Sequence, residues 1–253
     1  MRKLFLTVAC LGAVLMSGNW ANADIITTDR DGEETNHGTA LIISNDDLRT
    51  QNLVIDAFNG GGVVRFTTGG IIAQSTTTTI DIQAGIFSGS SDGNNFFGNN
   101  DTGNHTFTIS GGVVEFDGNL GIARDEATAL LTISGGAFIV DGTLSIDVLN
   151  GSNAGTEGDG TINFTTGSTG TLTAGRIQTD GSISATGGVT ADAAAYEALF
   201  TSGDLTFEGV NTGVFSEIFQ VNGNTLSLVA VPEPSSLALL GFGVVGLVAR
   251  RRK

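Results

Sequence analysis

The sequence has very little cysteine, proline, tryptophan and basic charge. A single cysteine in 253 residues excludes an intramolecular disulfide scaffold and a zinc site built from several cysteines. Eleven Lys and Arg stand against 26 Asp and Glu, which gives a net charge of −15. Because neutralising phosphates requires clustered bases, this balance predicts no nucleic-acid partner. Charged residues are only 15% and hydrophobic residues 40%, so the chain can bury a core.

The scarce residue types lie near the two ends and divide the chain into three segments. Both prolines follow residue 230, and four other rare residues precede residue 24, namely Met1, Cys10, Met16 and Trp20. Residues 24–230 contain five arginines, 25 acids and no lysine, for a formal charge of −20. We therefore predict a signal peptide at 1–23, a body at 24–230 and a sorting signal at 231–253.

The first segment has the three parts of a secretory signal peptide. Arg2 and Lys3 are followed by a mostly apolar run at residues 4–16, which is shorter than the roughly 20 residues of a membrane span. A small-x-small site follows at Ala21, Asn22 and Ala23. This order predicts cleavage before Asp24 and export of the body.

The body repeats itself at a spacing of 24 residues. Thr108–Gly112 and Thr132–Gly136 share the sequence Thr-Ile-Ser-Gly-Gly, and Asp117-Gly118 recurs as Asp141-Gly142. Such a period indicates a solenoid or an array of repeats. Short alternating segments separated by Gly-Gly and Asp-Gly turns are typical of strands. We predict an all-β, right-handed parallel β-helix, with an antiparallel β-sandwich as the alternative, because the same turns serve hairpins.

In such a stack, the Ile, Val, Leu and Phe side chains should form an internal ladder, while Thr, Ser and Asn face water. One alanine-rich stretch near 191–201 predicts a short helix that covers an end or a coil, with Asp192 as the N-cap and Gly203 just past its end. Strands are expected after it, at residues 205–207, 214–215, 218–221 and 226–229.

The sequence contains no recognisable catalytic constellation, which predicts a protein that is not an enzyme. His37 and His105 lie in Gly- and Asn-rich stretches and are expected on the surface. Paired acids, such as Glu115 with Asp117 and Asp125 with Glu126, keep a polysaccharide lyase or glycosidase as the alternative, because such enzymes use two carboxylates.

Two further hypotheses concern ions and ice. Oxygen-bearing side chains recur at turn positions and could hold Ca²⁺, although Asp and Asn favour turns without an ion; they are Asp92, Asn94, Asp117, Asn119 and Asp141. No cofactor is otherwise expected. Thr-x-Thr units at 106–108 and 171–173, and the threonine run 76–79, suggest an ice-binding face. These units do not recur in register, which argues against an ice-binding face.

The last segment carries the most specific pattern in the chain. It consists of a short polar motif, an apolar run at 237–249 and a basic terminus; the motif is Val231, Pro232, Glu233, Pro234 and Ser235, and the terminus is Arg250, Arg251, Arg252 and Lys253. This three-part tail resembles the PEP-CTERM sorting signal of exported proteins from Gram-negative bacteria. The resemblance implies recognition by an exosortase, a membrane transpeptidase-like enzyme that cuts near Pro-Glu-Pro, and an association with exopolysaccharide and biofilms.

The length of the apolar run and the basic residues after it fit a transient membrane anchor. Thirteen helical residues span about 20 Å, against a hydrocarbon core of about 30 Å, and the terminal bases should remain in the cytoplasm. We therefore expect brief anchoring in the inner membrane through 237–249, followed by processing by an exosortase-like enzyme.

Together these patterns predict an exported structural or adhesive protein of the cell surface or extracellular matrix. The glycine-rich body resembles the repeats of autotransporter passengers, which implies surface display. Exopolysaccharide is the candidate partner outside the cell.

Overall fold

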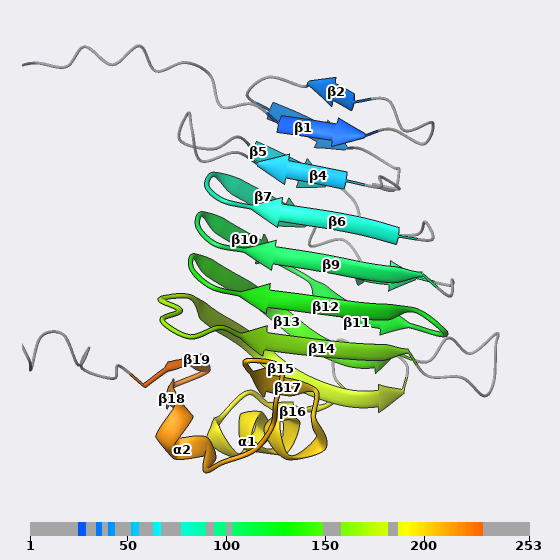
Figure 1. Ribbon diagram of the computed structural model, residues 1–253. Helices are drawn as coiled ribbons and strands as arrows, with labels where there is room; N and C mark the ends of the chain where they lie inside the picture. The colour runs from blue at the N-terminus through cyan, green and yellow to red at the C-terminus, as the bar shows by residue number, and fades with distance from the viewer. Residues whose placement is uncertain are drawn as a thin grey trace, which may run out of the picture.

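The computed structural model describes five short strands before residue 77 and then residues 77–89, 94–99, 103–148, 158–181 and 187–229. The predicted signal peptide and the residues of the predicted sorting signal lie outside this part of the chain. Within it, strands far outnumber helices, so the prediction of an all-β protein is confirmed. The strands form one sheet of eight and one of eleven (Figure 1).

The eight-stranded sheet has the spatial order β17-β14-β12-β9-β6-β4-β1-β2. Its strands are β1 (Ile25–Thr28), β2 (Glu34–Asn36), β4 (Asn52–Ile55), β6 (Thr77–Ile82), β9 (Asn104–Ile109), β12 (Thr128–Ile133), β14 (Asp159–Phe164) and β17 (Leu205–Phe207). Strands β4 to β17 pair in parallel, and β1 pairs antiparallel with both β4 and β2.

The eleven-stranded sheet has the main order β18-β19-β15-β13-β10-β7-β5-β3, with β8, β11 and β16 branching from it. Its strands are β3 (Ala40–Ile43), β5 (Val63–Phe66), β7 (Ile86–Gly89), β8 (Asn94–Asn99), β10 (Val113–Phe116), β11 (Asn119–Arg124), β13 (Ala137–Val148), β15 (Thr171–Gly181), β16 (Val189–Thr190), β18 (Phe219–Asn222) and β19 (Thr225–Leu228). The two helices are α1 (Ala193–Ser202) and α2 (Phe215–Ile218).

The 24-residue spacing of the sequence is the pairing register of the central strands. Ile109 of β9 lies beside Ile133 of β12, and Val114 of β10 lies beside Phe138 of β13. The neighbouring pairs have longer spacings, because Ile82 lies beside Ile109 and Ile133 beside Phe164. Each strand therefore stacks on the strand one repeat away, and the extra residues lie in the connections between strands.

The core is built from the alternate residues of these stacked strands. In β6, β9 and β12 every second residue is buried and the residues between them are exposed or half-buried, so alternate side chains point inward. Phe87, Phe107, Phe116 and Phe138 are essentially completely buried, and their neighbouring rings have centroids 5.5–6.1 Å apart. Such edge-on and tilted ring contacts stabilise a core beyond the burial of area alone, so the aromatic column ties successive repeats together.

The turns at Gly111-Gly112 and Gly135-Gly136 stack closely on one another. Gly112 and Gly136 both have a φ of +71°, which favours glycine. A Cβ atom on Gly136 would also lie only 2.7 Å from the carbonyl oxygen of Gly112. Glycine is therefore required here twice, by the backbone conformation and by the closeness of the next repeat.

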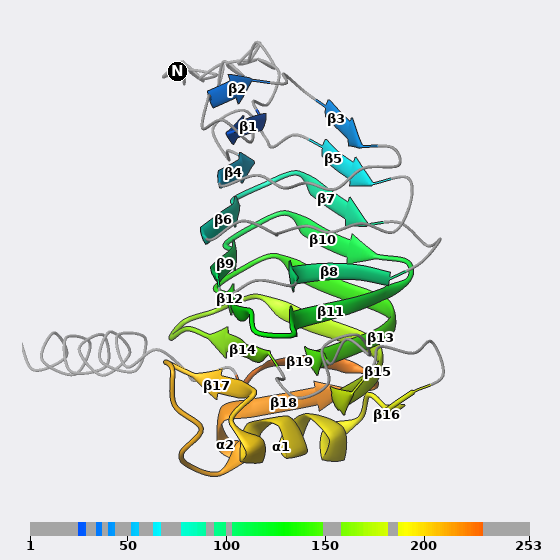
Figure 2. The same ribbon diagram turned by 90° about the vertical axis from the view of Figure 1, so that its right-hand side faces the viewer.

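Strands β8, β11 and the second half of β13 form a further side of the stack (Figure 2). Three aligned residues on this side have positive φ, namely Gly98 at +78°, Ala123 at +55° and Asp147 at +58°. They follow paired inward residues, such as Ile122 beside Ile146. The same irregularity is thus repeated in three successive strands, although only one of the three positions is glycine.

Helix α1 covers the C-terminal end of the stack, as Figures 1 and 2 both show. The Asp192 side chain accepts a hydrogen bond from the backbone N–H of Ala195, and Gly203 ends the helix with a φ of +106°. The predicted helix and both of its predicted caps are therefore confirmed. Its buried side chains face the stack and are Ala195, Tyr196, Leu199 and Phe200.

Two local predictions after this helix and within the repeats were wrong. Residues 214–215 are not a strand, since Phe215 begins the helical turn α2; a helical turn brings Phe215 and Ile218 to one face, whereas strand alternation would separate them. Asp141-Gly142 does not separate two strands but lies inside β13, where the pairing with β15 slips between Val140 and Thr143. None of the helices in the described ranges has the length and apolarity needed to cross a bilayer.

Candidate functional site

The predicted sorting, anchor and cleavage residues lie outside the described residues, but the structure shows where the body ends before them. The last strand is β19, and the backbone N–H of Val229 donates a hydrogen bond of 2.9 Å to the carbonyl oxygen of Ile218. The chain is therefore still attached to the body one residue past Leu228. Hardly any chain separates the fold from the residues that carry the predicted sorting motif.

Strand β19 is fixed in the C-terminal cap, which we define as residues 187–229. It pairs antiparallel with β15 and β18, and Leu226 is completely buried. The Tyr196 hydroxyl donates a hydrogen bond of 2.8 Å to the carbonyl oxygen of Asn224, just before the strand. Burial raises the pKa of Tyr196. The exit strand is thus an integral part of the packed end of the body.

The cap is acidic. It contains five acids and no base, and four of the acids are exposed; the five are Asp192, Glu197, Asp204, Glu208 and Glu217. The backbone N–H of Thr166 donates a hydrogen bond to the Glu208 carboxylate and lowers its pKa. Negative charge therefore predominates over the C-terminal cap.

Four of the five calcium candidates lie in the described part of the chain, and Asp92 does not. Asn94 and Asn119 are brought together, because the Asn119 side-chain amide donates a hydrogen bond of 3.0 Å to Asn94 Oδ1. Asn119 Oδ1 accepts a hydrogen bond of 2.9 Å from the backbone N–H of Thr143. This amide therefore links three successive strands, a role that needs no ion.

Asp117 and Asp141 occupy equivalent positions of adjacent repeats, directly after the paired residues Phe116 and Val140. Both are exposed. In the described ranges, no three or more His, Cys, Asp or Glu side chains come together as a group that could hold a metal ion. The two aspartates thus share a corner of the stack without a third acidic or histidine ligand among the described residues.

His105 was expected on the surface, and that expectation was wrong. It lies in β9, where Asn104 and Thr106 point outward, and it is only 2% exposed. Its ring packs edge-on against Phe97 at a centroid distance of 6.1 Å. The strand begins at Asn104, so the alternation of β9 directs the histidine inward together with Phe107.

The paired acids differ in their surroundings. Asp125 is almost fully buried, with its carboxylate 3.8 Å from Arg124 Nε, whereas Glu126 is exposed. Arg124 also donates a hydrogen bond of 2.9 Å to Asn99 Oδ1 and lies 4.5 Å over the ring of Phe96. Sequence analysis missed this cluster, because its members come from different repeats and no motif marks them.

The outward residues of β6, β9, β12 and β14 form a surface rich in threonine, which we call the threonine face. Pairing aligns Thr79 with Thr106 and Thr108 with Thr132. The Thr-x-Thr units themselves are out of register, as expected, because Thr77 lies beside Asn104, but single threonines of neighbouring strands align. Unequal connections between strands give unequal spacings in the sequence, and this concealed the register. The unit at 171–173 lies in β15 of the other sheet.

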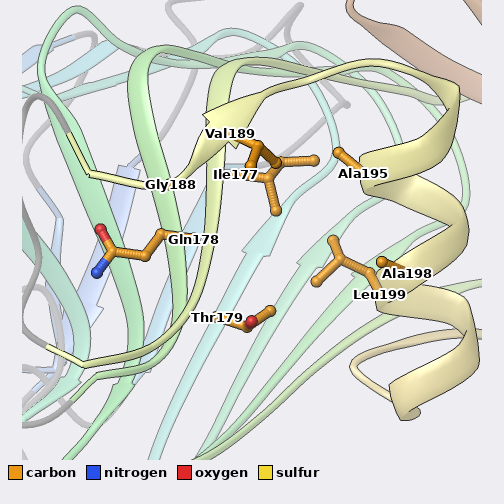
Figure 3. Close-up of a pocket in the computed structure, with 8 residues that line it drawn as sticks. All are labelled: Ile177, Gln178, Thr179, Gly188, Val189, Ala195, Ala198 and Leu199. Carbon is orange, nitrogen blue, oxygen red and sulfur yellow. The ribbon is translucent and has the colours of Figure 1, made fainter.

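A shallow pocket of about 330 Å³ lies between β15, β16 and α1 (Figure 3). Most of its lining is apolar; the residues are Ile177, Gln178, Thr179, Gly188, Val189, Ala195, Ala198 and Leu199. Arg176 holds one rim, because its Nε donates a hydrogen bond of 2.7 Å to the carbonyl oxygen of Gly187. The pocket contains no ionisable side chain in its lining.

Comparison with known families identifies the end of the chain. Residues 230–253 match the profile of the PEP-CTERM protein-sorting motif. This confirms the predicted motif and implies export through an exosortase-like sorting system to the cell surface or beyond. No curated protein and no solved structure matches the chain. The chain thus carries the sorting motif of exported proteins at its end.

Proposed function

We propose that residues 24–230 form a right-handed parallel β-helix that is displayed as a structural or adhesive module of the cell surface or extracellular matrix. The supporting observation is the repeated parallel register. Strand β9 pairs in parallel with β6 and β12, β10 pairs in the same way with β7 and β13, and β11 with β8 and β13. Three strands per repeat, each stacked on its counterpart, is the arrangement of a β-helical coil.

The body acts without catalysis in this proposal. The carboxylates that suggested an enzyme lie in dissimilar places: Asp125 is buried beside Arg124, and Glu126 is exposed. Glu115 is half-buried on the outside of β10. A closely packed stack with short outward side chains suits a rigid spacer or a surface for attachment better than it suits an enzyme.

Sorting depends on the tail, with the apolar run 237–249 acting as a transient anchor in the inner membrane. The motif begins at residue 230, directly after the strand that Leu226 fixes in the core. The exosortase-like enzyme therefore acts next to a folded cap. Processing near Pro232 and Pro234 then releases the body, with β19 retained as its last strand.

Mass spectrometry of the native exported product tests this sorting step. We expect a mature chain that begins at Asp24 and ends near the Pro-Glu-Pro site. A Pro232→Ala/Pro234→Ala variant should accumulate unprocessed in the membrane fraction, whereas a Ser236→Ala control should be processed normally. A mature product that still ends in Arg252-Lys253 would contradict the proposal.

The structural role is tested separately on the processed protein. We expect it to remain with the cell surface or matrix and to release no reducing ends or unsaturated products from the exopolysaccharide of its own source. Steady release of such products would instead identify an enzyme that acts on polysaccharide.

A further inference from the structure

The threonine face lies on four parallel strands whose pairing register is unbroken. Three outward positions on each of four parallel strands give twelve positions, of which seven are threonine. They align in three columns, namely Thr77–Asn104–Thr128–Asp159, Thr79–Thr106–Leu130–Thr161 and Asp81–Thr108–Thr132–Asn163. The four strands lie side by side across the front of Figure 1.

The parallel register gives this face a two-dimensional lattice. Neighbouring strands are about 4.8 Å apart, and alternate residues along one strand are about 6.6 Å apart. Threonine is branched at Cβ, so its χ1 angle has few choices and its methyl and hydroxyl groups are held in place. Oxygen atoms in the planes of ice repeat at similar distances in two directions. The face therefore presents fixed hydroxyl and methyl groups at spacings that a water lattice can adopt.

The charges of the face favour an uncharged ligand. None of its twelve positions is a base or a glutamate. Its two carboxylates, Asp81 and Asp159, belong to the outer columns, and Asp81 accepts a hydrogen bond of 2.8 Å from the side-chain amide of Gln83. The central column contains only threonine and Leu130. A body with a formal charge of −20 thus displays an uncharged central strip that suits a neutral solid such as ice.

The other sheet provides the contrast within the same molecule. The outward positions of β7, β10 and the first half of β13 contain no threonine; they are Ile86, Ser88, Val113, Glu115, Ala137 and Ile139. Parallel strands in the two sheets therefore display different outward side chains. Strand β15 of the same sheet does carry Thr171 and Thr173, beside Ala137 and Ile139, so threonine is concentrated on the threonine face but is not confined to it.

We propose that the threonine face binds ice. Water molecules ordered by the threonine hydroxyls and methyl groups join the lattice of the crystal, and the rigid stack keeps them in register. This activity goes beyond the structural or adhesive role and does not depend on it.

Thermal hysteresis and incorporation into a growing ice hemisphere test the proposal with the purified full chain. We expect a measurable gap between melting and freezing, and protein in the ice fraction. Thr106→Lys places a long cation in the central column and should reduce the hysteresis at least tenfold. Thr190→Lys adds the same charge to an exposed strand position in β16 and should leave it unchanged.

A second variant guards against loss of folding. Thr79 is exposed, so Thr79→Lys should keep the circular dichroism spectrum and melting temperature while weakening ice incorporation several-fold. Exclusion of the folded wild-type protein from ice would overturn the proposal. Equal hysteresis in the wild type and in folded Thr79→Lys and Thr106→Lys variants would also overturn it, since ice would then bind elsewhere.

Discussion

The central repeats and the C-terminal cap bury their aromatic side chains through different arrangements of strands and helices. Between β6 and β14, identical strand positions stack in parallel, and Phe107 contacts the rings of both Phe87 and Phe138. In the cap, helix α1 and the antiparallel pair β18–β19 enclose a compact group of rings around Phe219. The repeats are stabilised by contacts between successive parallel strands, whereas the cap covers the end of the stack.

This difference predicts where the molecule tolerates change. A residue in the repeats meets copies of itself above and below, so one substitution affects two interfaces. A residue in the cap meets unlike neighbours, and its loss should loosen one end only. The following substitutions test this contrast.

The largest effect is expected at a stacked turn. Gly136→Ala places a Cβ atom 2.7 Å from the oxygen of Gly112 in addition to the strain at φ +71°. Gly167 has nearly the same φ, +74°, with nothing within 4 Å. Urea unfolding should show a loss of about 1 kcal/mol for Gly167→Ala and of about 4 kcal/mol for Gly136→Ala. Equal losses would mean that the turns do not stack.

The next largest effect is expected when one aromatic ring is removed, and it should differ between the repeats and the cap. Phe138→Ala should lower the free energy of unfolding by about 3 kcal/mol, because Phe138 is fully buried between Phe107 and Phe116. Phe215→Ala should cost about 2 kcal/mol and reduce hydrogen-exchange protection in the cap alone. Comparable loss of protection in β9 and β12 after Phe215→Ala would show that the cap and repeats unfold as one unit.

The hydroxyl of Tyr196 connects the helix to the exit strand. Tyr196→Phe removes the hydroxyl that donates to the Asn224 carbonyl and should cost about 1 kcal/mol. Burial raises the pKa of Tyr196 in the folded state, so its contribution to stability is complete below the unfolded pKa of about 10 and is lost as the pH rises through the folded value.

Because the chain has one tyrosine, tyrosinate absorbance reports this group alone. The wild type should lose stability above about pH 10 more steeply than Tyr196→Phe. Parallel stability curves for the two proteins in that range would argue against a buried hydroxyl.

The smallest effect is expected at a position in the repeats where a residue other than glycine has a positive φ. Ala123 has a φ of +55°, so Ala123→Gly should raise stability by about 0.5–1 kcal/mol. Ala129 is equally buried but has no such conformation, and Ala129→Gly should lower stability by about 1 kcal/mol. Melting temperatures that fall by the same amount in both variants would contradict the assigned backbone strain.

The sequence predicted the repeats and the helix because local signals specify them. The Thr-Ile-Ser-Gly-Gly copies pair in register, and Asp192 and Gly203 act as the caps that their residue types favour. The sorting motif was equally readable, because it is a contiguous pattern of proline, charge and apolar residues.

The surfaces and the polar interior were not predictable in the same way. The alignment of Thr79 with Thr106 depends on the length of the connection between β6 and β9, which periodicity does not reveal. The burial of His105 depends on where β9 begins. The link from Arg124 to Asn99 joins side chains of different repeats. Each of these features is set by long-range register, which no local pattern of residues carries.

The most direct test of the stacked parallel register is a disulfide engineered across it. Residues 24–230 contain no cysteine, and Thr108 and Thr132 are paired in β9 and β12, at a Cα separation of about 5 Å that a disulfide can bridge. Mild oxidation of Thr108→Cys/Thr132→Cys should form this crosslink within one chain, as seen by peptide mass spectrometry. Thr106→Cys/Thr161→Cys, two strands apart in one column, should form none. A missing first crosslink, or an efficient second one, would contradict the parallel stack.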